Sequence, residues 1–100
     1  MKYFIDTHDR TKGSFPEQVL TEQQFFEQFD ALDRAAGEFH AFGHAAHVNL
    51  DQGKAFCFMS GPDEESIRKA HAAIDLPFDS ITEVRRVTGA DMRLPSEEKK

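Results

Sequence analysis

The sequence of 100 residues has a single cysteine, Cys57, and no tryptophan. One thiol excludes a disulfide framework within the chain and fits a reducing compartment such as the cytoplasm. No apolar run is long enough to cross a membrane, and residues 1–9 lack the apolar stretch and cleavage site of a signal peptide. The net charge is −6, with acids and bases interleaved, so the basic stripe of a nucleic-acid-binding protein is missing. We therefore expect a cytoplasmic protein that binds neither membranes nor nucleic acids.

Phenylalanine is abundant, with ten residues against one tyrosine in a chain of one-domain length. The first predicted strand covers residues 3–8. Its odd positions carry β-formers that suit a buried face, namely Tyr3, Ile5 and Thr7. We expect the even positions to point the other way, and these are Phe4, Asp6 and His8.

A helix is predicted from Thr21 onward, because Thr21 and Gln24 fit a capping box. Apolar residues then recur from Phe25 at spacings of four, three and four, which predicts one buried stripe. Gly37 is the expected C-cap. A second helix is expected to begin at Pro62, with acidic residues in its first turn and with an inner stripe of Ile67, Ala70, His71 and Ile74.

The segment HAFGHAAH holds three of the five histidines, at positions 40, 44 and 47. As a helix it would gather all three on one face, whereas as a strand His47 would point away from the other two. The turn signal DQG follows it and precedes a dense aromatic strand, which needs an antiparallel partner just before the turn. We therefore interpret residues 42–50 as a strand. With Gln52 and Gly53 as the turn, His47 falls opposite Phe58.

A last strand is predicted from Ile81, which completes the order strand, helix, strand, strand, helix, strand. This is the order of the ferredoxin-like βαββαβ arrangement. We expect one α+β domain over residues 1–90, with a four-stranded antiparallel sheet and two helices on one of its faces. Residues 91–100 are expected to form a polar C-terminal tail.

The face of the sheet without helices is predicted to carry aromatic and histidine side chains. We place His47, Asn49, Phe56 and Phe58 there, and expect the even positions of the first strand to join them. An exposed aromatic patch of this kind usually marks an interface. We therefore predict a homodimer that forms through the open sheet face.

The second half of the chain also resembles a known family. The resemblance rests on Phe56-Cys57, on the acidic start and His71 of the second helix, on Leu76-Pro77 and on residues 81–84. It extends over residues 45–84 and is to small bacterial ferredoxin-like proteins, largely uncharacterised, that carry a nickel-binding label. Their first strand has an acidic residue, here Asp6, and their second commonly has a histidine, here His47. The resemblance implies a ferredoxin-like fold and a transition metal, nickel, as cofactor. The chain departs from the family pattern at Ser60, where a glutamate is common.

Asp6 and His8 lie two residues apart on a strand and share a face, which His47 could reach from another strand. Imidazole and carboxylate ligands suit nickel, copper or zinc better than calcium or magnesium. We therefore predict a metal site built from Asp6, His8 and His47. His44 is held as a ligand of a second site, provided that a bulge at Gly43 turns it to the open face. The alternative is that Asp6 and His8 are solvated edge residues and that His47 packs in the dimer interface.

Three other residues are given structural roles. Cys57 is expected in the core, His71 as a buried histidine with a hydrogen bond, and His40 at the surface. Two further functions stay open. Dimeric ferredoxin-like domains resemble small monooxygenases and isomerases of the α+β barrel type, in which His47 or His71 would act as a general base. A ligand-free interaction module would use the open face alone.

Overall fold

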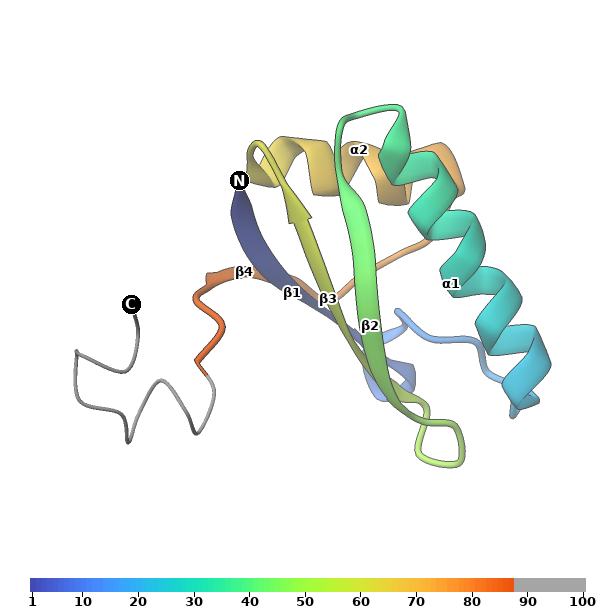
Figure 1. Ribbon diagram of the computed structural model, residues 1–100. Coiled ribbons are helices and arrows are strands. Elements are labelled where there is room, and N and C mark those ends of the chain that lie inside the picture. The colour runs from blue at the N-terminus through green and yellow to red at the C-terminus, as the bar shows by residue number, and fades with distance from the viewer. Residues whose placement is uncertain (88–100) are drawn as a thin grey trace.

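The computed structural model describes residues 1–87 of the chain. They follow the predicted β-α-β-β-α-β order, with one short 3-10 helix after the first strand (Figure 1). This confirms the α+β, ferredoxin-like fold. The predicted domain end at residue 90 and the tail at 91–100 lie outside the described residues. The elements are β1 Lys2–Asp9, η1 Arg10–Lys12, α1 Glu22–Gly37, β2 Phe42–Asn49, β3 Lys54–Gly61, α2 Glu64–Ala73 and β4 Ser80–Val84.

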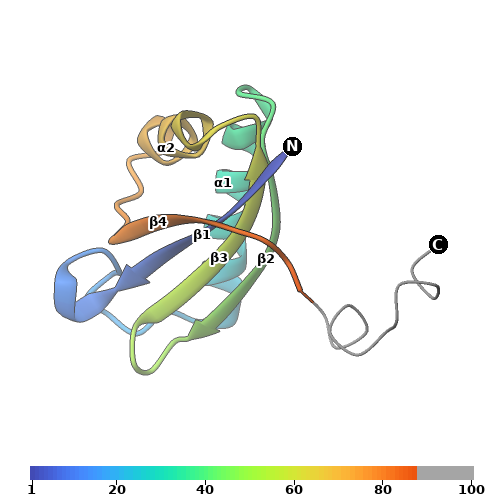
Figure 2. The same cartoon turned by 90° about the vertical axis from the view of Figure 1, so that its left-hand side faces the viewer.

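The strands form one antiparallel sheet in the order β2-β3-β1-β4. Helices α1 and α2 lie on the same side of this sheet (Figure 2), and we call the two sides the covered face and the open face. No helix within residues 1–87 is both long and apolar enough to cross a membrane. The core lies between the covered face and the helices, and its buried members are Phe4, Leu32, Ala36, Ala41, Cys57, Met59, Ile67 and Ala70.

The expected orientation of β1 is wrong. Phe4, Asp6 and His8 are only 1%, 0% and 5% exposed, and they lie on the covered face rather than the open one. The register explains the reversal, because Phe4 pairs with Met59 and Asp6 pairs with Cys57, whose side chains point to the helices. Both faces of β1 carry apolar side chains, so the alternation of residue types alone did not distinguish inside from outside.

The hairpin of β2 and β3 forms as predicted, but its register differs by two residues. Asn49 pairs with Lys54 across a four-residue loop, and His47 therefore lies opposite Phe56 rather than Phe58. Gly53 occupies the left-handed region at a φ of 67°, which a glycine adopts without strain. Because side chains alternate with a period of two, a two-residue shift leaves the side chains of residues 45–49 on the expected face.

A β-bulge interrupts β2 at the position where His44 required one. Gly43 pairs with Met59 and Ala45 pairs with Phe58, so His44 is the extra residue between them. The ring centroid of His44 lies 5.6 Å from that of Phe58. The bulge thus turns His44 toward the aromatic side chains of the open face.

The helix ends agree in part with the sequence. The predicted capping box of Thr21 and Gln24 is present at the start of α1. Helix α1 ends at Gly37, but the residue with left-handed backbone after it is His40, at a φ of 60°. Helix α2 is capped by Asp63, so Pro62 precedes the helix instead of lying in its first turn.

Candidate metal centre

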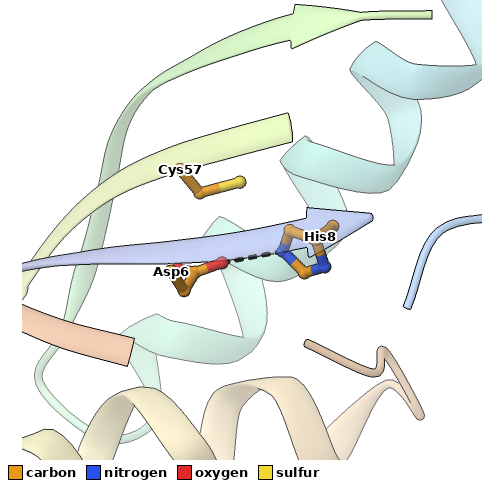
Figure 3. A group of neighbouring side chains, drawn as sticks. All are labelled: Asp6, His8 and Cys57. Atoms are coloured by element: carbon orange, nitrogen blue, oxygen red, sulfur yellow. Dashed lines mark hydrogen bonds and ion pairs between the residues drawn. The ribbon is translucent and has the colours of Figure 1, made fainter. Parts of the chain in front are cut away.

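Two neighbouring strands bring three ligand-bearing side chains together on the covered face. Asp6 and His8 extend from β1, and Cys57 extends from β3, where it is the register partner of Asp6 (Figure 3). One carboxylate oxygen, one ring nitrogen and the sulfur of this group all lie within 4.8 Å of one another. All three residues are buried, so water competes little for their lone pairs.

Helix α2 adds a fourth side chain that the group of three does not include. His71 is 1% exposed, and its Nε2 lies 3.0 Å from Oδ1 of Asp6. Nε2 of His8 lies 2.7 Å from the same oxygen. The two imidazole rings are stacked, with centroids 5.6 Å apart and planes 25° from parallel. A single carboxylate oxygen is therefore the meeting point of two ring nitrogens.

The outer nitrogen of each ring is held by a backbone carbonyl. Nδ1 of His8 lies 2.7 Å from the carbonyl oxygen of Pro77, and Nδ1 of His71 lies 2.8 Å from that of Ile67. A carbonyl only accepts, so each Nδ1 carries a proton and donates it. In a neutral ring the Nε2 is then a bare lone pair, and it is this atom that faces Asp6. Each bond between Nε2 and Asp6 needs an additional proton, on that ring or on the carboxyl group.

The carboxylate at the centre is incompletely satisfied. Within the described residues, Oδ2 of Asp6 is the one buried side-chain nitrogen or oxygen without a hydrogen-bond partner. Burial acts to raise the pKa of Asp6, but the hydrogen bonds and charges of His71 and His8 outweigh it, so the pKa of this carboxyl is lowered. Burial raises the pKa of the Cys57 thiol, and so do the charge of Asp6 and a hydrogen bond between the thiol and Asp6. A buried carboxylate oxygen without a hydrogen bond destabilises the fold unless a cation pairs with it.

The segment between α2 and β4 closes the site. Its Pro77 supplies the carbonyl that binds His8, and the ring of Phe78 packs edge-on against His71 with centroids 5.1 Å apart. A cavity of about 10 Å³ lies beside His8 and Cys57. This is the size of a single water molecule or ion. The cavity therefore adjoins the site at His8 and Cys57, while Asp6 and His71 do not line it.

The structure separates the predicted metal ligands into two groups. Asp6 and His8 are together as expected, but His47 is exposed on the open face and does not join them. The expectation that these three residues share a face is thus wrong, because β1 points the other way. His44 also lies on the open face, where its Nε2 is 2.6 Å from the hydroxyl of Ser60. His40 is exposed, as predicted.

Sequence reasoning gave structural roles to two residues that the structure adds to the site. Cys57 is buried as expected, and so is His71, but His71 has a carboxylate partner beside its backbone partner. The available signal was the inner stripe of the second helix, in which His71 is the single polar member. Once β1 is turned inward, that stripe faces Asp6.

Comparisons with known proteins agree with this fold. The model of the SCO4226-like family, described as nickel responsive protein, matches residues 4–84, which include all four residues of the site. No curated protein matches the chain. The crystal structure of SCO4226 from Streptomyces coelicolor A3(2) is similar, with a TM-score of 0.73 and 21% identity over 86% of this chain and 99% of that chain. That likeness shows a shared fold, and the family match shows that the chain belongs to the SCO4226-like nickel responsive protein family.

Proposed function

We propose that this protein binds a transition metal ion of the nickel type at the interior cluster of Asp6, His8 and His71. One observation carries the proposal. Both histidines donate Nδ1–H to backbone carbonyls, and both Nε2 atoms converge on Oδ1 of Asp6. Metal-binding histidines are typically fixed in this way, with the outer N–H bound to a carbonyl and the inner lone pair free for the ion. A cation at this point satisfies lone pairs that otherwise need protons.

The donor types favour a borderline metal. Neutral imidazole suits nickel, zinc and copper, whereas calcium and magnesium prefer sets made entirely of oxygen. The family description, nickel responsive protein, supports nickel among these ions. A bound ion would supply positive charge to a buried carboxylate and fix the two rings. The segment between α2 and β4 would restrict how many coordination positions of the ion remain open to water.

The size of the interior favours an ion over an organic substrate. The cavity beside His8 measures about 10 Å³, which is far below the volume of a typical small-molecule pocket. A monooxygenase or isomerase that used His71 as a general base would need its substrate within hydrogen-bond reach of that ring. His71 is only 1% exposed, so a substrate would reach its ring only if the packing around it opened. An ion bound among the buried ligand atoms needs no such opening.

Calorimetric titration of untagged, chelator-treated protein with nickel tests the proposal. We expect His8→Ala and His71→Ala to weaken binding strongly, because each removes a ligand. His47→Ala is the matched control and should bind like the wild type, since His47 lies exposed on the open face. Circular dichroism of every variant separates lost binding from lost fold. Wild-type protein that binds no nickel, or binding that depends on His47 and not on His8, contradicts the proposal.

We also propose that the protein forms a homodimer through the open face. Tyr3 and Phe58 stack there with ring centroids 5.5 Å apart and planes within 3°. Tyr3 is 39% exposed and Phe56 is 46% exposed, so a monomer would leave this aromatic surface in water. A two-fold axis through the face would bury the same patch of both copies.

Light scattering after size exclusion tests the dimer. The wild type should have the mass of two chains, and Phe58→Asp should have the mass of one. Phe26→Asp is the matched control, because Phe26 is 62% exposed on α1, away from the open face, and its change should leave the dimer intact. A wild type that is monomeric at micromolar concentration overturns this proposal.

A further inference from the structure

We infer that Cys57 is a thiolate ligand of the interior site and makes the site selective for sulfur-binding metal ions over hard ones. This inference rests on the proposed metal function and deepens it. It assigns a chemical role to a residue that sequence reasoning places in the core. The resulting ligand set is two imidazole nitrogens, one carboxylate oxygen and one sulfur.

The position of Cys57 supports this role. It is the direct register partner of Asp6, so both side chains project from adjacent strands on the covered face. Its Sγ belongs to the group of ligand atoms that lie within 4.8 Å of one another, together with atoms of Asp6 and His8. The residue is 3% exposed, and the small cavity beside the site is lined by both His8 and Cys57. An ion bound between the atoms of Asp6 and His8 would therefore have the sulfur close by.

A second observation concerns the carboxylate beside the cysteine. Asp6 is 0% exposed, and its Oδ2 has no hydrogen-bond partner among the described residues. Buried carboxylate oxygens normally accept a hydrogen bond, so an unpaired one calls for a physical explanation, and a bound cation supplies one. The backbone pairing of Asp6 and Cys57 places this carboxylate next to the sulfur. A cation shared by the two residues would satisfy both.

The chemistry of the step is a simple exchange. The thiol loses its proton to solvent as the bond between sulfur and metal forms, and no electron changes hands. Thiolate prefers zinc, copper, nickel or cobalt, and it disfavours magnesium, calcium and manganese, which prefer oxygen. With Cys57 as a ligand, the site should bind the first group over the second more strongly than the histidines and carboxylate alone would.

Cobalt(II) serves as the probe, because a cobalt–thiolate bond gives an intense near-ultraviolet charge-transfer absorption that imidazole and carboxylate do not. Full-length, metal-free protein is kept reduced with a phosphine and titrated with cobalt(II). We expect this absorption in the wild type and its loss in Cys57→Ser and in Cys57→Ala. We also expect the affinity for cobalt(II) to fall by at least about tenfold in both variants, the loss typical of even an outer partner of a metal site.

The outcomes distinguish the two proposals. Wild-type protein that binds cobalt(II) without the charge-transfer absorption overturns the role of Cys57 and leaves the metal function in place. Wild-type protein that takes up neither cobalt(II) nor nickel(II), measured by elemental analysis after dialysis, overturns both. The wild-type spectrum decides without any variant, so a Cys57 variant that fails to fold does not spoil the test. Competition with manganese(II) adds a second readout. The ratio of the affinity for cobalt(II) to the affinity for manganese(II) should be smaller in Cys57→Ser than in the wild type.

Discussion

Both faces of the sheet carry histidine side chains, but the histidines on the two faces differ in burial and in hydrogen bonding. On the covered face, His8 and His71 are held at both ring nitrogens, by a backbone carbonyl and by Asp6. On the open face, His47 is exposed and His44 bonds the hydroxyl of Ser60. Exclusion of water makes a lone pair expensive to leave unused, so the same imidazole becomes a candidate ligand on one face and an ordinary surface group on the other.

The comparison also shows what fixes a ring for chemistry. A histidine in water rotates and exchanges its protons freely, whereas the rings of the interior site are oriented by backbone atoms of α2 and of the segment that follows it. The backbone partners, Ile67 and Pro77, come from two different parts of the chain. The orientation of the two interior rings therefore depends on the packing of α2 and of the segment that follows it against β1.

The largest expected effect contrasts two adjacent residues of β1 that point to opposite faces. Phe4 is 1% exposed and packs in the core, so Phe4→Ala should lower the free energy of unfolding by about 3–5 kcal/mol. Tyr3 is 39% exposed, and Tyr3→Ala should cost about 1 kcal/mol, as an average substitution does. Urea unfolding of both variants, followed by circular dichroism at low protein concentration, measures the difference.

Equal losses in the two variants would contradict this assignment of the faces. A loss in Tyr3→Ala well above about 1 kcal/mol would mean that the open face is covered in solution. The proposed homodimer predicts this result at high protein concentration. The measurement is therefore repeated over a range of concentrations. A gap that closes as the concentration rises would locate the second copy on the open face.

Much of the fold could be predicted from the sequence. The element order follows from local signals, such as the capping box at Thr21 and the turn before Lys54, and both are present. The sequence could not predict by the same means which of the two alternating sets of β1 side chains is buried. Tyr3 and Ile5 look more apolar than Asp6 and His8, and ordinary burial preferences place the first pair inside. The preference fails because Asp6 has polar partners in the interior, since Oδ1 of Asp6 lies within hydrogen-bond distance of both His8 and His71.

The candidate site shows the same limit more sharply. Asp6 and His8 are predictable as a pair because they lie two residues apart in one strand. His71 is 65 positions from Asp6 in the chain and comes near only when α2 packs on the covered face. No spacing rule links residues at that distance. His47 lies on the open face as predicted, but Asp6 and His8 point to the covered face, so the sheet separates them from His47.

The next expected effect is stabilisation by metal on the covered face alone. Nickel at a hundred times its dissociation constant should raise the free energy of unfolding by about 2.7 kcal/mol, since an ion that binds only the folded state shifts the folding equilibrium by mass action. For a domain of this size, the midpoint of thermal unfolding should rise by roughly 10–20 °C. A chelator should reverse the shift. Scanning calorimetry with and without nickel gives the measurement.

Asp6→Asn removes the central charge with little change in shape, and its thermal midpoint should not respond to nickel. Asp33→Asn is the matched control. Oδ1 of Asp33 accepts the Gly43 amide N–H at 2.7 Å, and an asparagine oxygen can accept the same bond. This variant should respond like the wild type. A full nickel response in Asp6→Asn would show that the ion binds elsewhere, and the open face would become the place to search for it.

The smallest expected effect concerns how acid loosens α2, which covers the face and carries His71. The carboxylate of Asp63 caps this helix and accepts from the backbone N–H and the hydroxyl of Ser66, both at 2.8 Å. These bonds lower the pKa of Asp63 below its ordinary value of 3.8.

A carboxyl with a lowered pKa in the folded state contributes its full stability above the pKa of the unfolded state. That contribution is lost as the pH falls through the pKa of the folded state. Asparagine still accepts the capping bonds but has no charge to lose. The midpoint of thermal unfolding of Asp63→Asn should therefore lie slightly below that of the wild type at neutral pH, and the two should converge in strong acid. A gap that stays constant from neutral to strongly acidic pH would show that the charge of Asp63 does not stabilise the helix that covers the site.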